Sequence, residues 1–318
     1  MKELNTEKVS IGENVNYWFP KAEFDWEYLV FSQGDNKGSK KNQNIVSINM
    51  KKGTIEKTNT SNYAFTAAGV SDNYFYTFQA TTQDGGLYGF DKKGREVLSY
   101  LFEKSTTPST QFLGKNQKLY LSATQEVNEL YEHKLFIFEE KKDKLKEIKQ
   151  MNLDDNPEYI YGLTSLELIN DDLYLPITAL RNRQTFESIS DNRVMKVNVN
   201  TGQKEFLQLS QPYPNLINKS RLEKYLIITH EPNMLLKSGL SIVDLSTNLS
   251  TFLDISKILN STEYEESNIW SINTTKDDKL LILAGRYFLI YDLEKNELLA
   301  KEKIKKEEED FLYIWVNS

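Results

Sequence analysis

Short apolar and aromatic runs recur along the chain at a nearly constant spacing. Their first residues lie 46, 45, 54, 52 and 55 positions apart, a mean of about 50. The runs are 28–31, 74–76, 119–121, 173–175, 225–228 and 280–283. A self-similar period of this length indicates one supersecondary unit repeated six times.

Each run is followed by a second run with strand character, then by a polar turn, then by a third run. The second runs are 45–48, 87–90, 135–138, 194–197, 240–243 and 288–291. The third runs are 54–57, 96–100, 145–148, 205–209, 249–253 and 298–301. Gly or Asn occupies most of the turns, where a positive φ is needed. We therefore predict hairpins in every unit.

A fourth strand is expected before the first run of each unit. The segments Asn16–Phe19, Asn62–Phe65 and Asn268–Trp270 begin twelve residues before their runs, and weaker versions occur at 111–113, 159–163 and 216–220. No segment of any length has the 3.6-residue period of an amphipathic helix. The fold class is therefore predicted to be all-β, with four strands in each unit.

The turn segments resemble those of the β-propeller superfamily, in particular quinoprotein-like and YVTN-type propellers. In these propellers an apolar strand is followed by a turn with Asp, Gly and Lys and then by another strand. The segments that match parts of this signature are Gly89–Gly94, Val199–Gln203 and Ile290–Glu294. The markers of WD, kelch and sialidase repeats are missing. The resemblance implies a single propeller of four-stranded blades, and it carries over no functional residues.

The whole chain, 1–318, is expected to form one propeller domain. Six blades are favoured, with a seven-bladed ring containing one incomplete blade as the alternative. The extra strands would be Lys8–Ile11, within an N-terminal arm or closing strand (1–14), and Phe311–Val316, within a connector and closing strand (301–318). Pairing of the two termini would remove the exposed sheet edges.

The composition narrows the classes of partner. Lys and Arg number 39 against 46 Asp and Glu, so the net charge is −7, which disfavours nucleic acid and anionic lipid. There is no Cys, which excludes disulfides, thiolate metal sites and a cysteine nucleophile. No apolar run is long enough to span a membrane. We expect a monomer without a nucleic-acid partner or a membrane span in this chain.

The start of the chain, 1–10, lacks the apolar core of a signal peptide. A cysteine-free chain rich in Lys, Asn and Ile fits the mature part of an exported or lipid-anchored bacterial protein, with its signal removed. The sequence therefore favours an extracytoplasmic or cell-surface location, with the cytoplasm as the alternative.

Connection lengths predict which face of the propeller binds a ligand or partner. Numbered from the innermost strand of a blade, which precedes the first run, the connections between the first and second strands are short. The turns between the third and fourth strands, which join the second and third runs, are also short. The other two kinds of connection are long and are expected to be irregular loops on the opposite face. They are 33–44, 79–86, 124–133, 178–192 and 230–239 within blades, and 104–110, 150–158, 210–215 and 254–267 between blades. We expect any ligand or partner to bind at this long-loop face.

The segment 181–191 is the longest insertion within a blade, and it supplies most of the binding-face candidates. These are Arg181, Arg183, Phe186, Glu187 and Asp191. Two arginines in an acidic protein suit bidentate recognition of a carboxylate or phosphate. The favoured interpretation is instead a solvated loop with Phe186 and Ile189 folded back as its anchor.

Both histidines, His133 and His230, also fall at the edges of this face. One hypothesis is a metal or general-base site shared with Glu231, Glu132 or Asp191, although the metal is unknown. The alternative, favoured because no motif joins the two, is a pair of surface histidines that bond loop backbone. The acidic segment 260–266 could bind calcium, but it lacks the alternating Asp and Asn residues of a dedicated calcium loop. No other cofactor is expected.

The favoured function is a non-catalytic binding or scaffold propeller that recognises a protein or peptide through the long-loop face. A propeller hydrolase or lyase with its site in the channel mouth is the alternative, using His133, His230 and Glu231. Carbohydrate binding by Tyr131, Phe186 or Tyr213 is a second alternative. The fold by itself does not decide between them.

Overall fold

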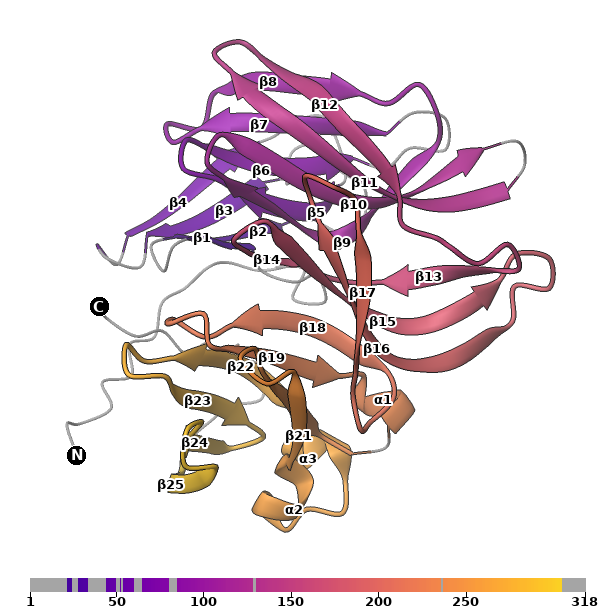
Figure 1. Cartoon of the computed structure of the whole chain (residues 1–318). Coiled ribbons are helices and arrows are strands. Elements are labelled where there is room, and N and C mark those ends of the chain that lie inside the picture. Colours follow the sequence, from indigo (N-terminus) through magenta and orange to yellow (C-terminus); the bar gives the residue numbers. More distant parts are fainter. Residues whose placement is uncertain are drawn as a thin grey trace.

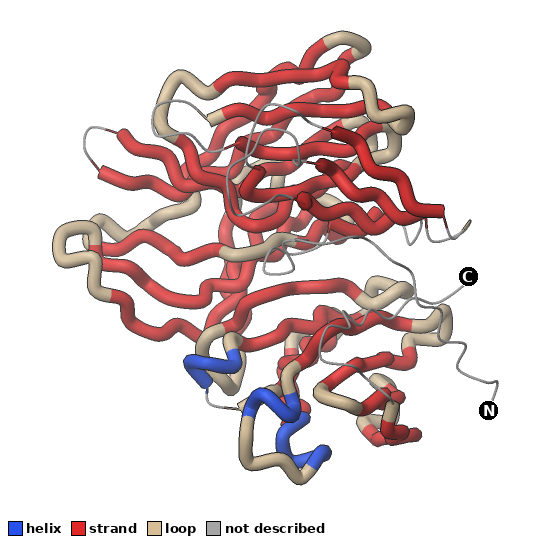
Figure 2. Tube along the Cα trace, turned by 180° about the vertical axis from the view of Figure 1, so that it is seen from behind, coloured by secondary structure: helices blue, strands red, loops and turns tan. Residues whose placement is uncertain are grey.

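The computed structural model describes residues 22–24, 28–33, 44–49, 52, 54–59, 65–79, 85–127, 130–235 and 237–304. Strands dominate this part of the chain, and the helices are confined to three short segments (Figures 1 and 2). The strands fall into six successive antiparallel units, so the predicted fold class and repeat are confirmed. The segments 8–11 and 311–316, on which a seventh blade depends, lie outside the described residues.

The first three blades are β1 (Ala22–Phe24), β2 (Tyr28–Gln33), β3 (Asn44–Asn49) and β4 (Thr54–Asn59); β5 (Phe65–Val70), β6 (Tyr74–Gln79), β7 (Gly86–Asp91) and β8 (Glu96–Leu101); and β9 (Thr106–Lys115), β10 (Lys118–Val127), β11 (Leu130–Lys141) and β12 (Lys144–Asn152). Each blade pairs its strands in chain order, from the innermost to the outermost. Tight turns set the register: Asn116 and Gln117 both have positive φ and close the β9–β10 hairpin, as a two-residue turn requires.

The last three blades are β13 (Tyr159–Leu163), β14 (Glu167–Ile169), β15 (Asp172–Asn182), β16 (Ser188–Asn198) and β17 (Lys204–Gln208); β18 (Pro214–Lys219), β19 (Tyr225–His230), β20 (Gly239–Asp244) and β21 (Leu249–Asp254); and β22 (Ile269–Thr274), β23 (Lys279–Ala284), β24 (Tyr287–Asp292) and β25 (Glu297–Lys303). In the fourth blade both β13 and β14 pair with β15, so its inner edge is split. Because β25 extends to Lys303, the predicted connector starts later than residue 301.

The second and third blades are joined into one eight-stranded sheet. Their inner strands β5 and β9 pair in parallel, with Gly69 opposite Phe112. A Cβ atom at Gly69 would lie 2.2 Å from the Phe112 ring, so only glycine permits this approach. The inner strands of these two blades are therefore held directly together by backbone hydrogen bonds.

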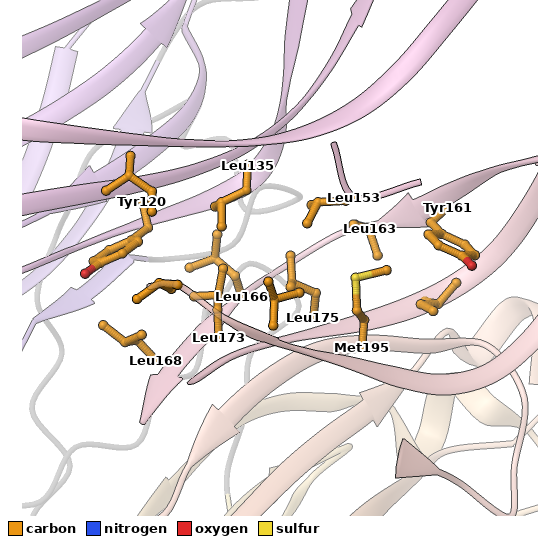
Figure 3. Close-up of a cluster of buried hydrophobic side chains, with 14 residues drawn as sticks. Tyr120, Leu135, Leu153, Tyr161, Leu163, Leu166, Leu168, Leu173, Leu175 and Met195 are labelled. Carbon is orange, nitrogen blue, oxygen red and sulfur yellow. The ribbon is translucent and has the colours of Figure 1, made fainter. Parts of the chain in front are cut away.

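The core consists of apolar clusters between neighbouring blades. Between the third and fourth blades, Tyr120 and Leu135 lie opposite Leu173 and Leu175, all buried (Figure 3). Between the second and third blades the cluster is aromatic, and Phe102 packs edge-on against Phe136 at a centroid distance of 5.1 Å. Each blade thus buries its faces against its neighbours, as in other repeat architectures.

Two connections predicted as irregular loops are instead extended hairpins. The β10–β11 pairing continues to Val127 opposite Leu130, and the β15–β16 pairing continues to Arg181 opposite Ser188. The loop prediction for 124–133 and 178–192 is therefore largely wrong. The segments 124–133 and 178–192 lack Pro and Gly and contain β-branched and aromatic residues, so they continue the ladder rather than leave it. The loop prediction for 104–110 is also wrong from Thr106 onward, where β9 begins.

The three helices occupy connections on the same side as the two hairpin ends. They are α1 (Pro232–Leu235), α2 (Ile255–Leu259) and α3 (Tyr264–Ser267). The Asp254 side chain accepts a hydrogen bond from the backbone N–H of Lys257 and caps α2. Within the described part of the chain, no helix has the length and apolar character needed to cross a bilayer.

Candidate binding face

The ends of the second-to-third strand connections in blades three, four and five form one surface, which we call the hairpin-end face. In a four-stranded antiparallel blade all such connections lie on the same side, and in Figure 1 they are at the right of the molecule. Large apolar side chains are exposed there. They are Leu130 (49%), Tyr131 (42%), Phe186 (50%), Ile189 (50%) and Met234 (55%).

Arg183 ties two of these hairpin ends together instead of pointing to solvent. Its Nη2 lies 3.0 Å from Asp154 Oδ2, and its Nη1 donates to the backbone oxygen of Tyr131. The side chains of Arg183 and Asp154 are 11% and 2% exposed. Arg183 is therefore engaged within the fold: one nitrogen contacts a carboxylate of the protein itself and the other a backbone oxygen, so it is not free to clamp a ligand bidentately.

Asp154 connects this ion pair to the backbone of both blades. It accepts hydrogen bonds from the backbone N–H of His133 at 2.7 Å and of Tyr161 at 3.0 Å. Burial raises the pKa of the Asp154 carboxyl, while these amides and the Arg183 guanidinium oppose the rise. Asp154 was not predicted, since one Asp in a polar connection gives no sequence signal.

His133 is a buried structural residue. Its Nδ1 lies 2.9 Å from the Tyr161 backbone oxygen and its Nε2 lies 2.8 Å from Ser122 Oγ. A carbonyl only accepts, so Nδ1 carries the proton and the Ser122 hydroxyl donates to Nε2. Burial lowers the pKa of His133 to about 4. The ring is therefore neutral at physiological pH.

His230 repeats this arrangement in the fifth blade. Its Nδ1 lies 2.7 Å from the Pro212 backbone oxygen, and its Nε2 lies 2.8 Å from Ser241 Oγ. Burial lowers its pKa as well. The expectation of backbone-bonded histidines is correct, but their expected surface position is wrong, since each is 4% exposed. The signal that could have revealed this is a Ser on the neighbouring strand of each blade, Ser122 for His133 and Ser241 for His230.

These histidines make stability depend on pH. In the unfolded chain a histidine binds a proton below about pH 6.5, whereas folded His133 binds one only below about pH 4. The stability of the fold therefore falls as the pH drops through this window. We expect His133 to contribute a loss of about 2 kcal/mol between about pH 7 and about pH 5. Chemical denaturation at both pH values checks this, with His133→Gln expected to show a shallower dependence. An unchanged slope in that variant would contradict the assignment.

The structure does not bring the proposed residues of a metal or general-base centre together with free ligand atoms. In His133 and His230 both ring nitrogens are already bonded to Ser and carbonyl groups. Glu231 accepts from Asn215 Nδ2 at 3.2 Å. Over the described ranges no three His, Asp or Glu side chains gather as metal ligands would.

Asp191 is likewise occupied within the fold. It is 7% exposed, and Arg193 contacts it with Nε at 3.0 Å and Nη2 at 2.6 Å. The Arg193 guanidinium also lies 4.8 Å from the Phe206 ring centroid. Sequence reasoning missed Arg193, although Asp and Arg two positions apart share a face of a strand.

Arg181, Phe186 and Glu187 are the candidates that do reach solvent. The Arg181 guanidinium carbon lies 5.1 Å from the Phe186 ring centroid, a cation–π contact. Phe186 has a φ of 60°, at a turn whose Asn182 side chain accepts from the amides of Gln184 and Thr185. The favoured interpretation, in which Phe186 and Ile189 fold back as anchors, is wrong, because both are half exposed.

No family model and no curated protein matches the sequence. Solved structures do match the fold. The β-propeller domain of Cps50 (Swd1) from Myceliophteria thermophila aligns with a TM-score of 0.59 at 10% identity, over 96% of this chain and 90% of that one.

Hydrazine synthase of Kuenenia stuttgartiensis aligns with a TM-score of 0.58 at 10% identity, over 94% of this chain and 90% of that one. Apo AztD from Citrobacter koseri gives a TM-score of 0.52 at 12% identity, over 90% and 72%. The names include an enzyme as well as proteins of other kinds, so they agree on architecture alone. The chain is a β-propeller, and no particular subfamily is indicated.

Proposed function

We propose that this propeller is a binding module that recognises a protein or peptide partner through the hairpin-end face. The observation that carries the proposal is the exposure of Leu130, Tyr131, Phe186 and Ile189 at the ends of two extended hairpins. Isolated exposed apolar residues are ordinary, but a group of them on neighbouring elements marks an interaction surface.

The rigidity of the hairpins also supports this proposal. Arg183 joins the ends of the third and fourth blades through Asp154 and Tyr131. The fifth blade is joined through the backbone of Tyr213. Its N–H donates to the backbone oxygen of Asp191, and its backbone oxygen accepts from the backbone N–H of Glu231. A surface held in place before binding loses little conformational freedom when a partner docks, which favours affinity.

The proposal predicts that polar substitution of the face removes binding. The variant Leu130→Ser, Phe186→Ser, Ile189→Ser is expected to lower partner affinity by at least about tenfold, because exposed apolar and aromatic anchors carry most of the energy of an interface. The measurement is quantitative affinity capture from the source cells with wild-type and variant protein.

The matched control carries three equally polar changes on the opposite face. Leu222, Leu249 and Leu298 are 51%, 69% and 39% exposed at turns of the first-to-second or third-to-fourth strand kind. Their replacement by Ser is expected to leave capture unchanged. Equal capture by both variants, or a loss only in the control, would overturn the proposal.

A further inference from the structure

The charges around the hairpin-end face are not balanced. Its blade-three and blade-four portion, residues 125–134, 154–158 and 181–193, contains four cations in its described part. Three of them are held in ion pairs: Lys134 with Glu132 at 3.3 Å, Arg183 with Asp154 at 3.0 Å and Arg193 with Asp191 at 2.6 Å. Only Arg181 remains for a partner.

The carboxylates left over are more numerous and are exposed. Glu126, Asp155, Glu158 and Glu187 have no ion pair in the described part of the chain. Asp155 accepts a hydrogen bond from the Tyr161 hydroxyl, which leaves its charge in place. Within the described part of these segments four exposed carboxylates and one exposed guanidinium lack an ion pair, so the exposed charge left over is negative, although Lys204 and Arg193 interact with Asp155 at longer range.

These carboxylates lie beside the exposed apolar side chains. Glu126 is opposite Tyr131 in the β10–β11 ladder, and Glu187 follows Phe186 directly. The backbone oxygen of Glu158 accepts from the Arg183 N–H at 2.9 Å, which places it against the same hairpin. Apolar contact and negative charge are thus combined on one surface.

Resting on the proposed function, we infer that the partner segment is basic as well as apolar: Lys or Arg residues placed next to aliphatic or aromatic ones. The apolar side chains supply the contact area, and the acidic side chains at its border select cationic partners and speed their approach. The overall charge of −7 acts in the same direction.

The test uses the whole protein and a random dodecapeptide phage library. Peptides selected on wild-type protein are expected to be enriched in Lys and Arg beside apolar residues. Their affinity should fall about tenfold in the variant Glu126→Gln, Glu158→Gln, Glu187→Gln, which corresponds to about 1.4 kcal/mol shared among three exposed border charges. Binding should also weaken with added salt.

A second variant controls for net charge. Glu96→Gln, Asp143→Asn, Glu294→Gln neutralises three exposed carboxylates at third-to-fourth strand turns, on the opposite face. Peptides that bind both variants equally, or that are neutral or acidic, would overturn the inference. If such peptides are still lost in the Leu130, Phe186, Ile189 variant, the proposed function stands and only the charge preference fails. If no selected peptide depends on that variant, the proposed function fails too.

Discussion

Replacing Arg183 with Met is expected to lower the free energy of unfolding by about 3–5 kcal/mol. The change leaves the Asp154 carboxylate, whose side chain is 2% exposed, without its charged partner. It also removes the hydrogen bond to the Tyr131 backbone oxygen, which joins the two hairpin ends. Urea denaturation at neutral pH measures the loss.

Two further variants identify the cause. Arg181→Met removes an exposed guanidinium two residues away on the same hairpin and is expected to change stability by no more than about 0.5 kcal/mol. Asp154→Asn combined with Arg183→Met removes the uncompensated charge and is expected to be more stable than Arg183→Met alone. If the double variant is the less stable of the two, the ion pair is not what holds the hairpin ends.

Replacing Gly285 with Ala is expected to cost about 4 kcal/mol. Gly285 lies in the β23–β24 turn with a φ of 53°, which disfavours a side chain by itself. A Cβ atom there would also lie 1.8 Å from the backbone oxygen of Glu266, and backbone cannot rotate away as a side chain can. Thermal and chemical denaturation both measure the effect.

Gly202 provides the matched control. It has a φ of 80°, but the nearest atom to an added Cβ is the Met151 sulfur at 3.4 Å, an ordinary contact. Gly202→Ala is therefore expected to cost about 1 kcal/mol, from the backbone conformation alone. Equal losses at the two positions would contradict the packing of Glu266 against the turn.

The repeat and the strand order were predictable from the sequence because they rest on local patterns. The run 225–228, for example, lies within β19, and Gly94 and Gly202 take the positive φ expected of their turns. Apolar alternation and turn residues are properties of a few neighbouring positions, and each blade repeats them.

The candidate site was less predictable because it depends on contacts between distant residues. Arg183 is paired with Asp154, 29 positions away, and no local pattern distinguishes it from exposed Arg181. His133 is buried because its ring bonds to Tyr161 of the next blade. The sequence placed Arg181 and Glu187 correctly on the surface, at the end of β15 and in the turn that follows, whereas its favoured interpretation of the loop folded Phe186 back.

The measurement that tests the binding face most directly is site-specific photo-cross-linking in the source cells. A photoreactive phenylalanine analogue replaces Phe186 in one variant and Leu249, on the opposite face, in another. We predict a discrete cross-linked partner from position 186 and none from position 249. Cross-linking from position 249 alone, or from neither position, would contradict recognition through the hairpin-end face.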